Sequence, residues 1–236
     1  MNNSNIDKFL TNLLGFKCFN ITSKKQINKY NKIKFHFLLI LKTFSNLKSQ
    51  ECKNFNIKLK SKLITFSKKI SHIEQVYYGC RFAKKKDLKQ ILEICRENPY
   101  GSRFERDSFL DKKFLFIYRA VWLKNFFKKI RGDYLIVAYK KNTILGCILL
   151  KNEMKNLRID QILVKNNFKK KGVASTLINY TNNHFLKKFN SIIAGTYNHN
   201  LAAKKMYKTL NFKSNGKCKN IYHIYPKRLK LQYMKK

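Results

Sequence analysis

A lysine-rich loop between an apolar run and an amphipathic stretch could bind a phosphate. The apolar run ends at Val164, and the sequence Lys-Lys-Lys-Gly-Val-Ala-Ser follows over residues 169–175. A strand that leads through such a loop into a helix directs free backbone N–H groups and the positive end of the helix dipole toward one point. Gly172 lets the backbone approach a ligand because it has no Cβ, and Ala174 keeps the first helical turn slim. The spacing fits neither the nucleoside triphosphate loop nor the GxGxxG dinucleotide fingerprint.

A second segment, residues 200–212, brings polar and small side chains to one helix face. Asn200, Ala203 and Tyr207 lie at positions i, i+3 and i+7, so they can line one groove. A tyrosine at such a place could supply a proton, but an aromatic residue on an amphipathic helix can equally be part of the core. Spacing alone leaves both roles open.

Together the two segments resemble the GNAT superfamily of N-acetyltransferases. Its first motif, Gln/Arg-x-x-Gly-x-Gly/Ala after a splayed strand, has the counterpart Lys169-x-x-Gly172-x-Ala174, with lysine in the first position. Its second motif, Asn-x-x-Ala-x-x-Leu/Phe-Tyr-x-x-x-Gly-Phe, matches from Asn200 onward, with Asn211 in place of glycine. Asparagine also tolerates the left-handed conformation that the end of a helix needs. The resemblance implies an α+β fold with a mixed central sheet, a splayed strand pair and flanking helices.

The resemblance also implies a site for acetyl-coenzyme A and a direct transfer of the acetyl group to an amine. Tyr207 is then the general acid that protonates the leaving thiolate, and no metal and no covalent acyl-enzyme are needed. Cys147 and Cys218 are therefore not expected to act as nucleophiles. The residues expected at the donor are Ile162, Leu163, Val164, Lys169, Lys170, Lys171, Gly172, Val173, Ala174, Ser175, Asn200, Ala203 and Tyr207.

The general base is not evident from the sequence. The ionisable groups nearest to the two motifs in the sequence are Asp133, Glu153, Asp160 and His199. Each fits a solvated or turn position as well as a catalytic one, and a chain of water molecules could serve instead.

An upstream segment resembles one branch of the superfamily, the N-acetyltransferases of thymidine diphosphate-linked 4-amino-4,6-dideoxy sugars. The similar features are Ser-Arg-Phe-x-x-Asp over residues 102–107 and Tyr-x-x-x-Trp-x-x-Asn over residues 118–125. A guanidinium can bind a phosphate through two hydrogen bonds, and aromatic faces stack on a sugar or base. The aromatic residues could instead form the core face of a helix. The residues expected at this acceptor are Arg103, Phe104, Asp107, Tyr118 and Trp122.

Two other functions stay open. A related acetyltransferase could modify a protein amine, as ribosomal-protein acetyltransferases do, although this chain is poor in the acids that would receive a basic peptide. A non-catalytic protein could bind RNA or ribosomes through lysines such as Lys58, Lys60 and residues 84–86. The chain has 52 Lys and Arg against 12 Asp and Glu, a formal charge of +40. These cations are spread through every segment, so nucleic acid is not the expected partner.

Composition places the chain among cytoplasmic globular proteins. Its 236 residues are 44% hydrophobic and can bury a real core. The six cysteines form no CxxC pair, so reduced thiols are expected and a zinc site is not. The apolar run over residues 37–41 is too short to cross a membrane and indicates a buried strand. Whether the protein forms a homodimer is left open.

The order of the expected elements agrees with this fold. A small α/β N-terminal subdomain of unknown role is expected over residues 1–75, and the acetyltransferase domain over residues 76–236. Hydrophobic periodicity and turn residues predict the elements of the second domain. Helices are expected over residues 87–97, 114–127, 173–185 and 201–210, and strands over residues 78–83, 134–139, 143–150, 157–164, 191–197 and 220–225.

Overall fold

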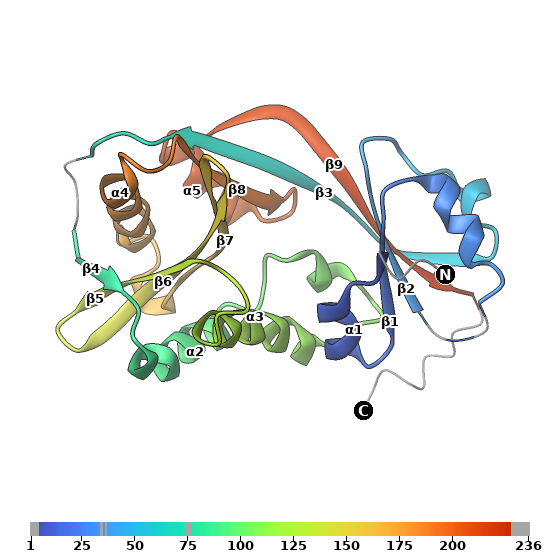
Figure 1. The fold of residues 1–236 in the computed structure, drawn as a ribbon, viewed down its shortest axis with the longest axis horizontal. Helices are drawn as coiled ribbons and strands as arrows, with labels where there is room; N and C mark the ends of the chain where they lie inside the picture. Colours follow the sequence, from blue (N-terminus) through green and yellow to red (C-terminus); the bar gives the residue numbers. More distant parts are fainter. Residues whose placement is uncertain (1–4, 34, 36, 74–76, 228–236) are drawn as a thin grey trace. The chain divides into compact units, whose positions relative to one another are not determined.

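The structure is a computed structural model, and it describes residues 5–33, 35, 37–73 and 77–227 (Figure 1). Its contacts group into two compact units. Unit 1 comprises residues 1–64, 102–112 and 216–236, and unit 2 comprises residues 65–101 and 113–215. Two long strands, β3 (Phe55–Lys69) and β9 (Lys213–Pro226), contribute residues to both.

Unit 1 is built on four strands in the order β1-β2-β9-β3. Strand β1 (Lys17–Ile21) runs parallel to β2 (Phe37–Thr43), and β2 runs antiparallel to β9. The helix α1 (Lys8–Leu14) and the 3-10 helices η2 (Lys24–Tyr30), η3 (Ser49–Cys52) and η5 (Arg103–Arg106) complete it. Alternate residues such as Leu39, Leu41 and Tyr222 pack in one core on one face of this sheet.

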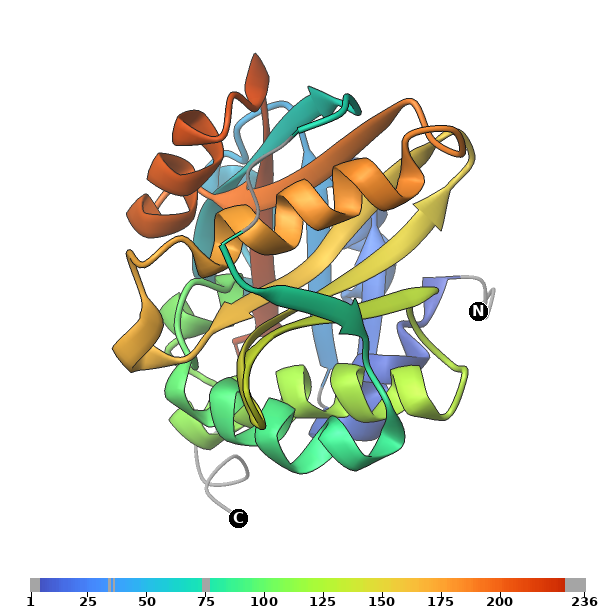
Figure 2. The ribbon, with the colours of Figure 1, turned by 90° about the vertical axis from the view of Figure 1, so that its left-hand side faces the viewer.

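Unit 2 contains the strand order β3-β8-β7-β6-β5-β4. Two of its helices, α2 and α3, lie on one face of the sheet and α4 lies on the other (Figures 1 and 2). Its strands are β4 (Gly79–Phe82), β5 (Tyr134–Lys140), β6 (Thr143–Glu153), β7 (Asn156–Val164) and β8 (Ser191–Tyr197). Its helices are η4 (Lys85–Asp87), α2 (Leu88–Glu97), α3 (Lys112–Phe127), η6 (Asn166–Phe168), α4 (Val173–Phe185) and α5 (Leu201–Thr209).

The two parallel strands β7 and β8 separate part of the way along their length. They pair from Asn156 with Ser191 to Ile159 with Ala194, whereas β7 continues to Val164. On its other edge β7 stays paired with β6 as far as Val164 opposite Gly146. The second half of β7 therefore has a partner on one side only among the described residues. This is the splayed strand pair expected from the sequence.

The mixed α+β fold expected from the sequence is confirmed. Every helix and strand expected after residue 76 is present within a few residues of its predicted bounds, except that β9 begins seven residues earlier, at Lys213. In the N-terminal part, the buried strand expected at residues 37–41 is β2, and all five of these residues are fully buried. The domain boundary near residue 76 stays a prediction. No helix in the described parts of the chain is both long and apolar enough to cross a membrane.

Gly146 allows β6, β7 and α4 to pack closely. A Cβ at this position would lie 2.8 Å from the Leu163 carbonyl oxygen and 2.8 Å from Cγ1 of Val173. Ordinary Cβ atoms do not approach other atoms so closely, so either the strand or the start of α4 would have to move. The glycine thus fixes the position of α4 relative to the end of β7.

We expect Gly146→Ala to lower the free energy of unfolding by about 1–3 kcal/mol through this overpacking. Urea denaturation followed by circular dichroism measures the change. Val173→Ala removes one of the two close contacts. Gly146→Ala should therefore cost less stability when it is introduced into the Val173→Ala variant than when it is introduced into the native chain. An unchanged denaturation midpoint for Gly146→Ala would contradict the close packing.

Candidate functional site: the phosphate loop and its surroundings

The loop between β7 and α4, residues 165–172, leads directly into an uncapped helix start; we call it the phosphate loop after the role expected from the sequence. Lys170 and Gly172 both adopt the left-handed conformation, with φ of 61° and 78°. Gly172 is the residue before the first turn of α4 and provides no side-chain cap. The first N–H groups of a helix have no acceptor within the helix. They are therefore available to an anion, which the helix dipole also favours.

The lysines of the phosphate loop add positive charge around this helix end. Lys169, Lys170 and Lys171 are all exposed, and the ammonium of Lys171 lies 5.6 Å from the centre of the Phe168 ring. Side chains that point into solvent can reach the outer oxygens of a phosphate while backbone groups hold the inner ones. The residues present therefore fit a pyrophosphate.

The end of helix α2 anchors the start of the phosphate loop. The Glu97 carboxylate accepts a hydrogen bond from the Asn166 N–H at 2.6 Å, and the Asn98 amide donates to the Val164 carbonyl oxygen at 2.9 Å. Both contacts join residues that are more than sixty positions apart in the sequence. Sequence reasoning missed Glu97 and Asn98 because nothing local marks either one.

The direction of the peptide groups in β7 follows from its pairing. The Lys165 N–H donates to the Leu145 carbonyl oxygen at 2.8 Å, toward β6. Alternate residues of an antiparallel strand direct their peptide groups to opposite sides. Ile162 and Val164 therefore direct theirs away from β6, into the region where β7 and β8 separate. Leu163, between them, is buried.

The second motif forms the start of α5. The Asn200 side chain accepts from the Ala203 N–H at 3.1 Å and donates to the Gly101 carbonyl oxygen at 3.2 Å. Asn200 thus caps the helix and ties it to the end of the segment after α2. Asn211, at the other end, has a φ of 61°, the left-handed conformation expected where the family has glycine.

Tyr207 is buried on the inner face of α5. Its side chain is 3% exposed, and its ring lies 5.5 Å from that of Phe66 and 5.2 Å from that of Phe212. Burial raises the pKa of the Tyr207 phenol above its ordinary value. The hydroxyl is therefore protonated throughout the neutral range, as a proton donor must be.

In unit 1, Asp107 is the centre of a buried hydrogen-bond network. Its Oδ2 lies 2.5 Å from Nδ1 of His223 and accepts from the Tyr225 hydroxyl at 2.7 Å, while Oδ1 accepts from the Phe109 N–H at 3.0 Å. Asp107, His223 and Tyr225 are all at least 97% buried. The geometry gives Asp107 a structural role in tying residues 102–112 to strand β9. Its contact with an acceptor stays a prediction.

Arg103 and Phe104 lie next to this network. The Arg103 guanidinium is stacked over the Phe104 ring at 4.4 Å, and the Phe104 ring is 5.3 Å from that of His223. Within the described residues Arg103 has no carboxylate partner. Phe104 is 4% exposed, which agrees with the alternative that it belongs to the core.

Tyr118 and Trp122 lie on α3 in unit 2. Tyr118 is 8% exposed and contacts Trp122 edge to face, with ring centres 5.4 Å apart. The Arg131 guanidinium lies 3.5 Å from the centre of the Trp122 ring and pairs with Asp160 at 3.0 Å. The expected acceptor residues are thus divided between the two units, and their common role stays a prediction.

All four acidic or basic candidates for a general base take part in interactions. Asp160 pairs with Arg131, and burial raises the pKa of its carboxyl group. Glu153 is bound by Arg158, which lowers the pKa of the Glu153 carboxyl group. Asp133 accepts from the Asn152 N–H at 2.6 Å. The fourth, His199, stacks with Tyr197 at 5.8 Å.

The buried cysteines are poor nucleophiles. Burial raises the pKa of the Cys147 thiol well above its ordinary value, and that of Cys95 to about 11. A thiol in such surroundings is not ionised at neutral pH. This agrees with the expectation that Cys147 does not form an acyl-enzyme.

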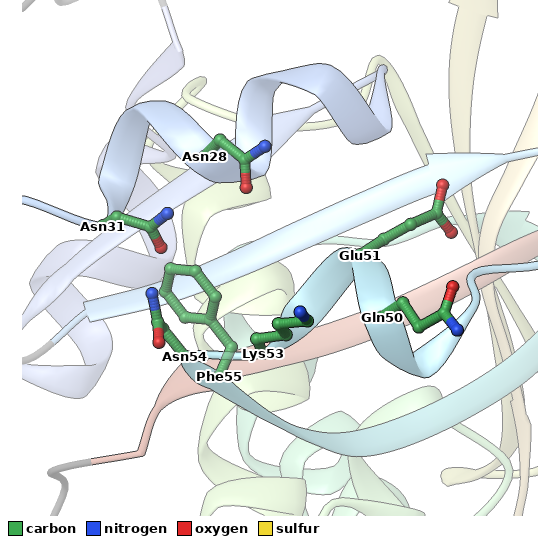
Figure 3. A pocket seen from close by; sticks show the side chains of 7 residues that line it. All are labelled: Asn28, Asn31, Gln50, Glu51, Lys53, Asn54 and Phe55. Atoms are coloured by element: carbon green, nitrogen blue, oxygen red, sulfur yellow. The ribbon is translucent and has the colours of Figure 1, made fainter.

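A cavity of about 360 Å³ in unit 1 does not coincide with the expected sites (Figure 3). Figure 3 shows mostly amide side chains around it, and none of the residues expected from the sequence lines it. Its lining residues are Asn28, Asn31, Gln50, Glu51, Lys53, Asn54 and Phe55.

Comparison with known proteins shows the family to which this chain belongs. A family model described as Acetyltransferase (GNAT) family matches residues 86–212. A conserved protein of unknown function from Staphylococcus epidermidis has the same fold, with a TM-score of 0.64 and 13% identity over 97% of this chain and 93% of its own. A GNAT-family protein from Novosphingobium aromaticivorans has a TM-score of 0.56 and 8% identity, over 84% of this chain and 79% of its own. An N-acetyltransferase from Sphaerobacter thermophilus has a TM-score of 0.53 and 13% identity, over 80% of this chain and 59% of its own.

The family model spans more than half of the chain, so the chain belongs to the GNAT family of acetyltransferases. It is an N-acetyltransferase that uses acetyl-coenzyme A as the acetyl donor. No curated protein matches the sequence significantly. At the identities given above, the structural likenesses support the fold alone.

The pH dependence of stability should report on His223. Burial lowers the pKa of the His223 imidazole below its ordinary value of about 6.5, as do the positive charges of Arg103 and Lys42, whereas the hydrogen bond to Asp107 raises it. Between the lowered pKa and about 6.5, the unfolded chain binds a proton that the folded chain does not. Stability should therefore fall as the pH decreases through this window, by up to about 1.4 kcal/mol per pH unit.

Urea denaturation at a series of pH values measures this slope. His223→Gln should flatten it, even though this substitution also lowers the stability at every pH. His184→Gln, on an exposed residue of α4, is the control and should retain the slope. A slope that persists in His223→Gln would show that other groups titrate in this range.

Proposed function

We propose that this enzyme transfers the acetyl group directly to the primary amine of a nucleotide-linked amino-deoxy sugar, with Tyr207 as the general acid. The observation that carries the transfer chemistry is the arrangement in unit 2. The uncapped start of α4 follows the half of β7 that has separated from β8. The start of α4 could bind a pyrophosphate through its N–H groups, and the separated half of β7 could bind the pantetheine arm attached to that pyrophosphate.

The donor would be held mainly by backbone groups. The first N–H groups of α4 would bind the pyrophosphate, with the lysines of the phosphate loop around it. The peptide groups of Ile162 and the N–H of Val164 would hydrogen-bond the pantetheine arm, as an added strand pairs with an open sheet edge, while the Val164 carbonyl oxygen stays bound to Asn98. Lysine at position 169 is compatible with this mode, because backbone groups do most of the binding.

The chemical step needs a proton donor and a place for negative charge. The amine nitrogen attacks the thioester carbonyl carbon, and the carbonyl oxygen becomes an oxyanion. An N–H group of β7 would stabilise that oxyanion. As the carbon–sulfur bond breaks, the thiolate takes the proton of the Tyr207 hydroxyl, and the amine gives up its own proton to solvent. The Tyr207 phenolate then takes a proton from solvent, which restores the acid. Burial keeps the Tyr207 phenol protonated and makes it a weaker acid than a free tyrosine, so its proton would move as negative charge develops on the sulfur beside it.

The acceptor assignment is supported by the cations of unit 1. Arg103 has no carboxylate partner within the described residues, and the nearby Asp107 accepts its hydrogen bonds from other groups. Burial lowers the pKa of the Lys42 ammonium, and the positive charges of Arg103 and Lys219 lower it further, whereas Asp7 raises it. A diphosphate would relieve the repulsion among these cations. A guanidinium stacked on a ring can bind such a group through two hydrogen bonds.

Replacement of Tyr207 by phenylalanine tests its role as the acid. We expect kcat to fall by about 10²-fold or more, since general acid catalysis contributes about 10²–10⁴-fold. The KM for acetyl-coenzyme A should change little, because the ring and its packing remain. Release of free thiol from acetyl-coenzyme A measures the rate, and Tyr197→Phe on β8 is the matched control. A kcat within twofold of the native value would exclude Tyr207 as the acid.

The acceptor is tested with the same assay on a thymidine diphosphate-linked amino sugar, a basic peptide and a polyamine. We expect turnover with the nucleotide sugar, and Arg103→Gln should raise its KM about tenfold, or about 1.4 kcal/mol. Arg106→Gln, on the exposed side of the same short helix, should have little effect. Turnover on the peptide and on none of the nucleotide sugars would instead favour a protein acetyltransferase.

A further inference from the structure

Two tyrosines that precede β4 are fixed to the phosphate loop. The Tyr78 hydroxyl donates to the Lys171 carbonyl oxygen at 2.9 Å, and the Tyr77 N–H donates to Oγ1 of Thr176 in α4 at 3.3 Å. These residues are about 100 positions apart in the sequence. Neither tyrosine belongs to a recognised motif, so sequence reasoning did not select them.

The Tyr77 ring lies directly against Gly172. A Cβ at residue 172 would be 3.1 Å from Cδ2 and 3.5 Å from Cε2 of this ring. Glycine at this position therefore permits the close approach of the ring as well as the left-handed φ of 78°. The ring remains 59% exposed. It is an aromatic surface open to solvent, held in place by its own backbone at the start of the anion-binding helix.

We propose that Tyr77 stacks on the adenine base of the acetyl donor. This rests on the proposed binding of the pyrophosphate at the start of α4. Coenzyme A continues from its pyrophosphate in two directions, to the pantetheine arm on one side and to adenosine with its 3′-phosphate on the other. The separated half of β7 and Tyr207 are assigned to the pantetheine side, which leaves Tyr77 for the nucleotide side.

The surroundings of Tyr77 suit a phosphorylated nucleoside. A base can stack on an exposed aromatic side chain, and every base presents a face that can stack. The exposed lysines of the phosphate loop can pair with the 3′-phosphate that accompanies the base. Tyr77 thus selects the complete coenzyme over pantetheine derivatives that lack the nucleotide.

The test compares acetyl-coenzyme A with acetyl-phosphopantetheine, which lacks the nucleotide. Tyr77→Ala should raise the dissociation constant of coenzyme A about tenfold in calorimetry and leave that of phosphopantetheine within twofold. Tyr77→Phe should bind both like the native chain, because the ring is retained. Tyr100→Ala removes another exposed tyrosine of unit 2 and is the control. The thiol-release assay should show the same pattern in the KM of the two acetylated donors.

The alternative is that Tyr77 only supports the phosphate loop. Tyr77→Ala would then weaken both ligands equally, as expected for Tyr78→Phe, which removes the hydrogen bond to the Lys171 carbonyl. Equal weakening, or no change for coenzyme A, overturns the proposal. Adenosine 3′,5′-bisphosphate is a further probe that needs no acetyl transfer, and Tyr77→Ala should reduce its affinity as well. A native chain that binds no coenzyme A would instead refute the site assigned to the phosphate loop.

Discussion

The separation of two parallel strands is the constraint on which the rest of this structure depends. Beyond Ile159 and Ala194, β7 and β8 no longer pair, and β7 presents peptide groups with no strand partner among the described residues on that side. Buried peptide groups need hydrogen bonds, so an open edge of this kind is either hydrated or bound by a ligand. A pantetheine arm, which contains two amides, can supply such hydrogen bonds. The break in the sheet is therefore where we propose that this arm binds.

Several contacts fix the position of the separated end of β7 relative to the phosphate loop. Gly146 lets β6 and α4 approach it, and Asn98 binds the carbonyl group of Val164. Tyr78 binds the loop from the other end, at Lys171. Because the anion would be held by backbone N–H groups, whose positions depend on the fold, these supporting contacts matter as much as the loop residues themselves. The positions of these N–H groups therefore depend on how β6, β7 and α4 pack together.

Unit 1 shows how a residue with an expected ligand role can have another task. Asp107 belongs to a segment that resembles acceptor-binding sequences, yet its carboxylate is occupied by His223, Tyr225 and the Phe109 N–H. A buried carboxylate requires several donors to offset its desolvation, and this one has three. The segment is thereby anchored to β9 by Asp107, while Arg103 keeps its positive charge without a carboxylate partner in the described residues.

The sequence by itself determined the family, the order of elements after residue 76 and the place of the glycine-containing loop between β7 and α4. These features depend on local causes: alternation of apolar residues, a glycine at a left-handed position and the free N–H groups of a helix start. It did not show α1 or the polar first half of β9, whose pairing is decided by distant strands. Nor could it show the partners of Asp107, the hydrogen bonds of Asn98 or the contact of Tyr77 with Gly172. Those arise between residues far apart in the chain, and only the tertiary structure brings them together.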